Sequence, residues 1–268
     1  MTIVWSTFDL ETTSTVPKKA KVVQAALVSI DGEGNARAFC KLFHAAHIPP
    51  GAASVHGIDV EQLAECPPFE HYVESTIAAL EKAEHVVTYN GTMYDLLVLD
   101  AYAQRVDPTG GLRRRLTALR AKHVDVFRAW KRTQATDPLA ACYSGSLSGA
   151  HAFYFGETFD GAHDAANDCR ATQRVLDRML QSHDVETLVR WSSLPLPGCA
   201  DMDGKLKWAG DTLTLTIGEH AGEDVAEVDR GFLLWMLRPN KDFAPDTCAI
   251  IRQVLAGDYP VRHYEDEA

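Results

Sequence analysis

The sequence predicts an α/β fold, because strand and helix patterns follow one another along its first two thirds. Residues 3–12 form an alternating apolar run, and residues 21–30 and 38–43 predict two further strands, so a meander of three strands is expected. The apolar segment 86–89 ends at Asn90-Gly91 and precedes a helical pattern. This order is typical of a βα unit whose loop lies at the carboxyl end of the strand.

Four further segments complete the predicted fold. Residues 54–59 predict a loop entering a short helix, and Pro67-Pro68 predicts the start of an amphipathic helix. Residues 122–127 predict a last strand running into a helix, with Asp125 as its N-cap or as a nearby support rather than as a metal ligand. Residues 147–155 predict a short aromatic-rich helix.

Composition is that of a globular protein. The 268 residues are 46% hydrophobic and 24% charged, enough for one good-sized core plus a small second domain. No apolar run approaches the roughly 20 residues that span a bilayer, and Met1 leads directly into a strand pattern, so we expect a cytoplasmic protein without membrane contact. The six cysteines include no Cys-x-x-Cys pair, which indicates neither a disulfide framework nor a zinc ribbon.

Three parts are predicted along the chain: a first domain over residues 1–184, a linker over 185–210 and a small α+β domain over 211–268. The linker is inferred from prolines and glycines among short apolar stretches. The last part is predicted to contain one strand and two helices, over residues 213–217, 229–237 and 245–255.

The net charge of −11 is divided unevenly along the chain. Residues 201–268 hold 14 acidic and 7 basic side chains, whereas residues 105–132 hold nine basic side chains against Asp107 and Asp125. A phosphate-facing patch and a solvated basic surface are both open interpretations of this basic segment.

Two carboxylates of the first strand and one of the following helix are candidate metal ligands. Asp9 and Glu11 lie two residues apart on a strand, so their side chains leave the same face and repel each other unless a cation lies between them. Asp95 shares a helix face with the apolar Leu99 and Tyr102, where an unpaired carboxylate is costly.

A second helix supplies a further carboxylate, Asp168, on the face that is predicted to meet the sheet. Alanines and Cys169 surround it, so this helix can approach the strand of Asp9 and Glu11 closely. His163 is out of phase with Asp168 on a regular helix, and we therefore expect it on the preceding loop, free to move over the site.

Three ordered segments carry a resemblance to a known family. They are Phe8-Asp9-Leu10-Glu11-Thr12, the run from Tyr89 to Asp95, and the run from His163 to Asp168, and they are supported by Val55-His56-Gly57-Ile58. Over residues 1–182 the chain resembles the DEDDh superfamily of 3′-to-5′ exonucleases. The sister subgroup has a tyrosine where this chain has Asp164, so the histidine subgroup fits.

The resemblance implies an RNase H-like fold: a mixed five-stranded sheet, three antiparallel strands and then two parallel ones, flanked by helices. It implies two Mg²⁺ or Mn²⁺ ions, which can stabilise both the attacking and the leaving oxygen in phosphodiester hydrolysis. It also implies His163 as the general base. The implied metal ligands are Asp9, Glu11, Asp95 and Asp168. The implied frame for the terminal nucleotide is the backbone at Leu10, Thr12 and Asn90.

Residues 215–235 resemble the small C-terminal module of exodeoxyribonuclease X-like proteins. That module usually carries lysines in its glycine-flanked turn, where this chain has Glu219, Ala221 and Glu223. An acidic surface favours docking of a protein partner, or self-association, over phosphate binding.

The sequence thus predicts a metal-dependent 3′-to-5′ exonuclease that releases nucleoside 5′-monophosphates from single-stranded DNA or frayed 3′ ends. An exoribonuclease is one alternative, since no residue can be tied to recognition of the 2′-hydroxyl group of RNA. A nucleic-acid-binding adaptor without turnover is another, and the presence of all five catalytic residue types disfavours it.

Overall fold

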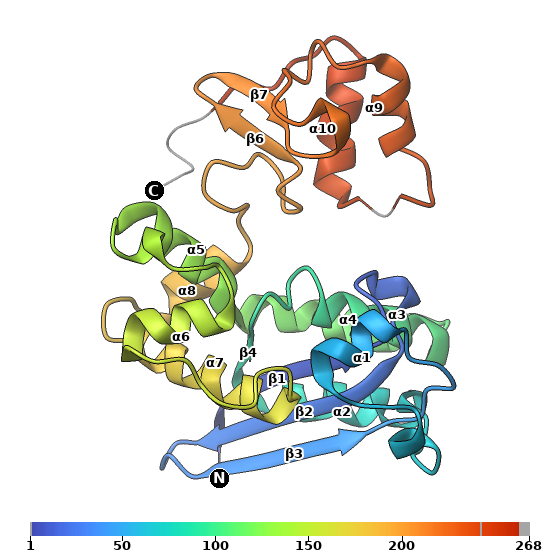
Figure 1. The fold of residues 1–268 in the computed structure, drawn as a ribbon, viewed down its shortest axis with the longest axis vertical. Coiled ribbons are helices and arrows are strands. Elements are labelled where there is room, and N and C mark those ends of the chain that lie inside the picture. The colour runs from blue at the N-terminus through green and yellow to red at the C-terminus, as the bar shows by residue number, and fades with distance from the viewer. Residues whose placement is uncertain (1, 242, 263–268) are drawn as a thin grey trace. The chain divides into compact units, whose positions relative to one another are not determined.

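The first part of the chain is built on one five-stranded sheet (Figure 1). The computed structural model describes residues 2–241 and 243–262, and the chain divides into two compact units, residues 1–193 and 194–268. The strands of the first unit are β1 (Ile3–Thr12), β2 (Val22–Asp31), β3 (Ala36–Leu42), β4 (Ala83–Thr88) and β5 (His123–Asp125).

The sheet has the order β3-β2-β1-β4-β5. The first three strands pair antiparallel as a meander, with Asp9 opposite Ala26 and Glu11 opposite Gln24. Strand β4 pairs parallel to β1, and β5 pairs parallel to β4. This confirms the predicted mixed sheet, with three antiparallel strands and then two parallel ones.

Helices cover both faces of this sheet (Figure 1). On one face Phe8 and Leu10 of β1 belong to a core with Leu99 and Tyr102, and on the other Val87 packs in a core with residues of four helices. The helices of the first unit are α1 (Pro50–His56), α2 (Val73–Glu81), α3 (Asp95–Val106), α4 (Gly111–Ala118), α5 (Val126–Thr136), α6 (Leu147–Phe155), α7 (Ala165–Met179) and α8 (Val185–Ser192).

Helix α7 approaches β1 and β2 closely because its facing side chains are small. Ala165, Ala166 and Cys169 are buried against Ala26 and Val28 of β2. The Cys169 thiol donates to the carbonyl oxygen of Thr7 at 3.3 Å, and the Thr7 hydroxyl donates to Gln173 at 2.9 Å. The side chains of β1 that alternate with Phe8 and Leu10 therefore point toward α7, and these include Asp9 and Glu11.

The second unit has a core of its own. It contains β6 (Leu206–Ala209), β7 (Thr212–Leu215), α9 (Arg230–Met236) and α10 (Pro245–Leu255). Buried Leu206, Leu213 and Ile251 form its centre, and the partly buried Trp235 packs against them. The predicted strand and both predicted helices are present, with ends that differ by up to two residues, and Asp229 caps α9 by accepting from the Phe232 N–H.

Two sequence-based expectations differ from the structure. Residues 54–59 do not enter a helix; they contain the end of α1, which stops where Gly57 adopts a left-handed φ of 69°. The expected linker over 185–210 includes the helix α8, which packs on β5, and the strand β6. Asp184 caps α8, and the apolar side of that helix explains why it belongs to the first unit. No helix in the described ranges is long and apolar enough to cross a membrane.

The close approach of α7 to β1 leads to a stability prediction. Cys169→Leu adds volume at a site with no exposure, so it should force α7 away from β1 and lower the free energy of unfolding by about 1–3 kcal/mol in a urea titration. Cys169→Ala, which adds no volume, should cost less. Equal stability of the leucine variant and the unchanged protein would contradict the close packing of α7 on β1 and β2.

Candidate active site

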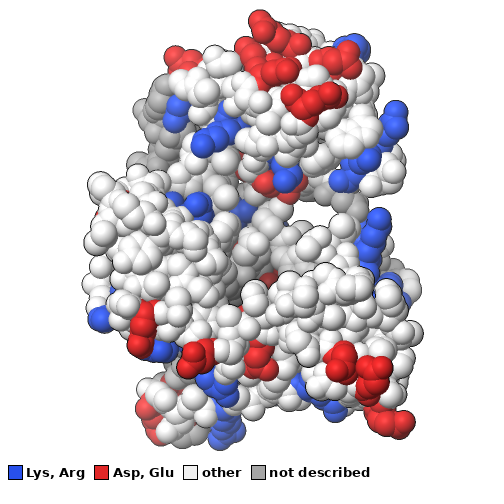
Figure 2. All heavy atoms as spheres, viewed as in Figure 1, with Lys and Arg blue, Asp and Glu red and all other residues white. Residues whose placement is uncertain are grey.

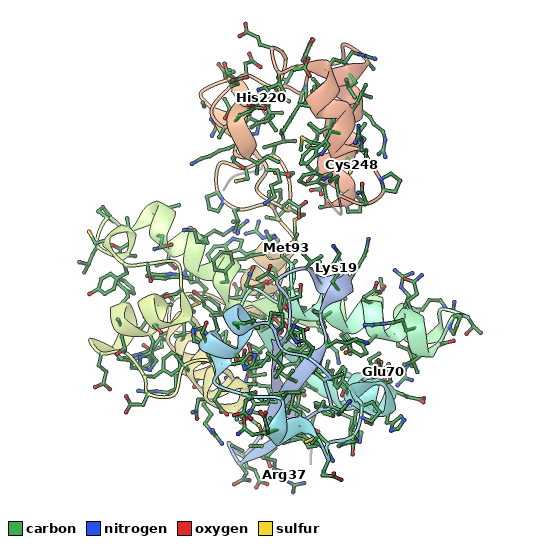
Figure 3. All side chains as sticks on the ribbon, turned by 45° about the vertical axis from the view of Figure 1, so that its right-hand side comes forward. Lys19, Arg37, Glu70, Met93, His220 and Cys248 are labelled. Carbon is green, nitrogen blue, oxygen red and sulfur yellow. The ribbon has the colours of Figure 1, made fainter. Side chains whose placement is uncertain are left out.

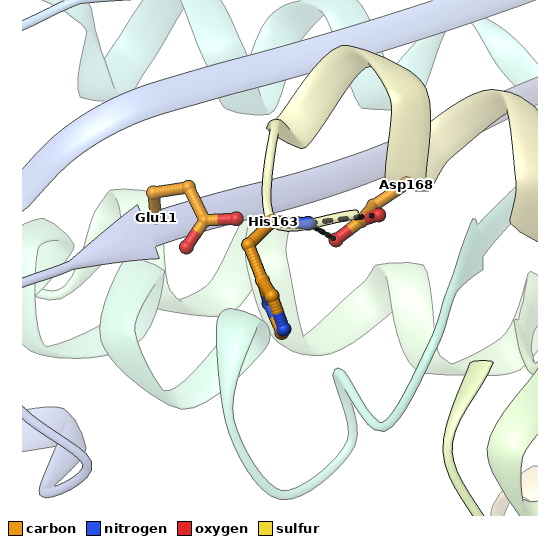
Figure 4. A group of neighbouring side chains, drawn as sticks. All are labelled: Glu11, His163 and Asp168. Atoms are coloured by element: carbon orange, nitrogen blue, oxygen red, sulfur yellow. Dashed lines mark hydrogen bonds between the residues drawn. The ribbon is translucent and has the colours of Figure 1, made fainter. Parts of the chain in front are cut away.

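Strand β1 carries two of the candidate carboxylates at the centre of the sheet. Asp9 and Glu11 lie on the same side of the strand, and the Glu11 side chain is 8% exposed. Figure 4 shows the Glu11 carboxylate near His163 and Asp168, which come from the other end of the first unit's sequence. The ligand atoms of these three residues all lie within 4.8 Å of one another.

Asp95 reaches the same place from α3, of which it is the first residue. Its side chain is buried, and its Oδ1 accepts the N–H of Leu10 at 3.1 Å, so the carboxylate is attached near the carboxyl end of β1, between Asp9 and Glu11. The β4–α3 loop (residues 89–94) brings α3 to this position. The prediction that Asp95 occupies an inward helix face is confirmed.

Asp168 lies in the first turn of α7, and His163 lies just before that helix, as predicted. Asp164 caps α7 by accepting the Asn167 N–H. His163 adopts a left-handed φ of 68°, and its backbone N–H faces Asp168, with its nitrogen 3.2 and 3.4 Å from the two carboxylate oxygens (Figure 4). A non-glycine residue in this region is uncommon, and such conformations occur often at functional sites.

Burial, followed by repulsion from neighbouring acids, raises the pKa values of the four carboxylates. Loss of hydration raises the pKa of Asp9 well above its ordinary value, and the charges of Asp95, Asp168 and Glu11 raise it further. Burial, followed by the charges of Asp168 and Asp95, raises the pKa of Glu11 to about 8. Burial also raises the pKa of Asp95 to about 7 and that of Asp168 to about 6. Each carboxylate is held in a place that disfavours its charged form.

Such a donor set fits a divalent cation. Carboxylate oxygens are the ligands that Mg²⁺ and Mn²⁺ prefer, and a cation among these side chains would remove the repulsion that raises their pKa values. Oxygens of Glu11 and Asp168 lie within 4.8 Å of each other, and Asp9 and Asp95 are near enough to interact with them through their charges, so all four can supply ligands. The His163 ring lies close enough to Glu11 and Asp168 to bind a cation or a water molecule beside them.

The three predicted nucleotide-framing residues lie next to these carboxylates, but some of their backbone groups have partners within the chain. The Leu10 N–H donates to Asp95, and the Asn90 N–H donates to Asp125 at 2.8 Å. The Thr12 hydroxyl contacts the hydroxyl of Tyr94. Those two N–H groups therefore have partners within the chain already, and the Leu10 side chain lies in the core.

Two residues near the site, Gln24 and Tyr94, were not predicted from the sequence to have a role there. Gln24 of β2 donates to the Asp164 carboxylate at 3.0 Å and accepts the Ala165 N–H at 3.0 Å, so it holds the start of α7 on the sheet. A polar residue within the apolar run of β2 was the available signal. Tyr94 directly precedes Asp95, and its hydroxyl donates to the carbonyl oxygen of Ser14.

Several side chains of the basic segment 105–132 have partners within the protein, which disfavours a phosphate-facing patch for them. Arg113 pairs with Asp100 at 2.8 Å, and Arg115 pairs with Glu81 at 2.6 Å. Arg128 is 1% exposed. Nearer to the site, the turn Pro17–Lys19 packs against α3, and Figure 3 labels Lys19 there together with Met93 of the β4–α3 loop. The lysines of that turn are exposed.

A mixed five-stranded sheet with acidic side chains converging at its central strand is the arrangement implied by the exonuclease resemblance. The sequence agrees: residues 6–176, more than half of the chain, match the family RNase_T, described as exonuclease. The chain belongs to this exonuclease family. No curated protein matches the chain significantly.

Solved structures share the RNase H-like exonuclease fold at low sequence identity. Escherichia coli Exonuclease I in complex with a dT13 oligonucleotide has a TM-score of 0.55 and 19% identity, covering 66% of this chain and 41% of that one. Exonuclease I from Methylocaldum szegediense has a TM-score of 0.55 and 21% identity, covering 68% and 42%. This chain thus spans less than half the length of these two structures, and the likeness confirms the predicted fold.

The raised pKa values predict how stability depends on pH and on metal. Between the ordinary glutamate value of 4.5 and about 8, the folded state retains protons that the unfolded state releases, so without divalent ions the free energy of unfolding should fall as pH rises. Thermal unfolding in EDTA and in Mn²⁺ should therefore show a larger Mn²⁺-induced rise in Tm at about pH 8 than at about pH 5.

The variant Asp9→Asn separates this effect from general salt stabilisation. Removing one of the four charges should raise the Tm of the metal-free protein at about pH 8 and abolish the gain from Mn²⁺. The exposed Glu65→Gln is the matched control and should change neither quantity. A Mn²⁺ effect of the same size at both pH values, or one that survives in Asp9→Asn, would contradict the predicted cation site.

Proposed function

We propose that this protein is a metal-dependent 3′-to-5′ exonuclease that acts on single-stranded or frayed DNA ends and releases nucleoside 5′-monophosphates. The observation that carries the proposal is the gathering of acidic side chains at β1: Glu11, Asp168 and the His163 ring lie within 4.8 Å of one another, Asp95 accepts the N–H of Leu10 between Asp9 and Glu11, and the charges of Asp95 and Asp168 raise the pKa values of Asp9 and Glu11. Membership of an exonuclease family supports this reading of the acidic cluster.

Each residue has a defined part in the proposed mechanism. Asp9, Glu11, Asp95 and Asp168 would hold two Mg²⁺ or Mn²⁺ ions. Divalent ions supply charge neutralisation for the phosphate and lower the pKa of a nucleophilic water. His163 would take a proton from that water at a ring nitrogen, and its exposed position leaves the imidazole open to solvent for release of that proton.

The position of His163 supports a role as base, with a role as ligand as the competing reading. Its ring nitrogen lies within 4.8 Å of oxygens of Glu11 and Asp168, which fits either role. The backbone N–H of His163 donates to the Asp168 carboxylate, so the main chain holds the two residues together whatever role the imidazole ring has. The two roles predict different effects on metal affinity.

The substrate class is proposed from solved structures that share the fold. Escherichia coli Exonuclease I, which shares the fold, has been solved with the oligonucleotides dT13 and dA16. The exposed lysines of the turn Pro17–Lys19, close to the β4–α3 loop, would favour an anionic strand beside the site.

The second unit is proposed as a site of protein docking or self-association. Figure 2 shows acidic side chains gathered along the upper edge of this unit. Between residues 211 and 229 the chain has acidic side chains and no lysine or arginine, and Glu219, Glu223 and Glu227 are exposed. This surface would repel a phosphate backbone and attract a basic protein surface.

The variant His163→Ala tests the role of the histidine. As a general base, His163 should contribute about 10²–10⁴-fold to turnover, so its loss should lower kcat by that amount and leave Mn²⁺ affinity in calorimetry unchanged. His47→Ala, a change at another exposed histidine, should alter neither. A loss of Mn²⁺ affinity would indicate a ligand instead, and an unchanged kcat at saturating Mn²⁺ would contradict the role as general base.

A single assay distinguishes the proposed activity from its alternatives. Single-stranded DNA, duplex DNA and RNA, each labelled at the 5′ end, are incubated with Mg²⁺ or with EDTA. A ladder of shortened 5′-labelled DNA that requires Mg²⁺ is expected. Degradation of RNA alone would favour the exoribonuclease, and degradation of no substrate would favour the adaptor.

A further inference from the structure

Asp125 is a buried carboxylate that organises the β4–α3 loop from outside the acidic cluster. It is the last residue of β5, and its side chain is 0% exposed. One carboxylate oxygen accepts the Asn90 N–H at 2.8 Å and the other accepts the Thr92 N–H at 2.9 Å. Its Oδ1 also caps α5 by accepting the Phe127 N–H at 3.2 Å. A single carboxylate thus satisfies three backbone donors.

The loop that Asp125 holds has little freedom to find another arrangement. Asn90 is one of two non-glycine residues with a positive φ in the described ranges, at 64°. Gly91 donates to the Thr88 hydroxyl at 3.1 Å, and a Cβ atom at Gly91 would lie 2.4 Å from that oxygen. Three residues after Thr92, the chain reaches Asp95. The two N–H contacts of Asp125 therefore fix the direction in which α3 begins.

Asp125 is itself fixed by α8, the last helix of the first unit. Its own N–H donates to the Ser192 hydroxyl at 2.7 Å, and that hydroxyl donates to the Leu188 carbonyl oxygen at 2.7 Å. Ser192 is 4% exposed. Hydrogen bonds therefore connect α8 to Asp125, and Asp125 to the β4–α3 loop. The loop leads directly into Asp95, which accepts the Leu10 N–H of β1.

We propose that Asp125 is a positioning residue for the metal site, with Ser192 as its support: it sets the position of the Asp95 carboxylate by holding the backbone of the β4–α3 loop. This inference rests on the proposed function, since it presumes that Asp95 binds a divalent cation. Ligand-orienting contacts of this kind typically change metal affinity by about 10–100-fold when they are removed.

The variant Asp125→Asn tests the proposal because it preserves shape but not acceptor number. The asparagine amide has one oxygen, so its nitrogen must face either the Asn90 N–H or the Thr92 N–H. Because both groups are donors, that hydrogen bond to the loop is lost. The Mn²⁺ dissociation constant of the full chain, measured by calorimetry with Mn²⁺ alone, should rise about tenfold. With DNA, the Mn²⁺ concentration for half-maximal rate should rise in parallel, while the rate at saturating Mn²⁺ should largely recover.

Two further variants separate positioning from general stability. Ser192→Ala leaves the Asp125 carboxylate in place and removes only its support, so it should raise the Mn²⁺ dissociation constant in the same direction by less than Asp125→Asn; it also keeps the test open if Asp125→Asn fails to fold. Leu63→Ala truncates a fully buried side chain in a separate cluster, so it should lower Tm without changing Mn²⁺ affinity.

The outcomes separate this inference from the proposed function. Weaker Mn²⁺ binding in Asp125→Asn and Ser192→Ala, but not in Leu63→Ala, would support it. Unchanged Mn²⁺ affinity in the two polar variants, or equal weakening in Leu63→Ala, would overturn it while leaving the proposed function standing. Absence of Mn²⁺ binding by the unchanged protein would overturn the proposed function and this inference together.

Discussion

The placing of four carboxylates side by side in the interior is the constraint on which the acidic site of the first unit depends. Asp9, Glu11, Asp95 and Asp168 come from three elements; burial raises the pKa of each, and the charges of Asp95 and Asp168 raise those of Asp9 and Glu11 further. Bringing such groups together costs free energy unless a cation is bound. The surrounding structure must therefore hold them in place, and much of the hydrogen bonding around the site does so.

The main chain supplies much of that restraint. Asp95 accepts the N–H of Leu10, and Asp168 faces the N–H of His163, so two of the four carboxylates are anchored to backbone near the others. Gln24 holds the start of α7, and Asp125 holds the loop before α3. Small side chains on α7 let this helix lie close enough to β1 for the anchoring to work.

Much of this could be predicted from the sequence, and the failures have a common cause. The strands and most helices follow from periodicity, and the candidate ligands follow from short segments in which carboxylates share a strand or helix face. Partnerships between distant residues leave no such pattern: the side chains of Arg113 and Arg115 pair with acids, and Asp125 accepts N–H groups more than 30 residues away. Helix α8 was missed because the prolines and glycines after it dominated the prediction of a linker.

The proposed metal site is tested most directly by a crystal structure of the protein soaked with Mn²⁺, with anomalous scattering used to locate the ions. We expect Mn²⁺ peaks bonded to oxygens of Asp9, Glu11, Asp95 and Asp168. Peaks at other residues only, or none at a Mn²⁺ concentration that supports nuclease activity, would contradict the claim that these carboxylates converge in order to bind metal.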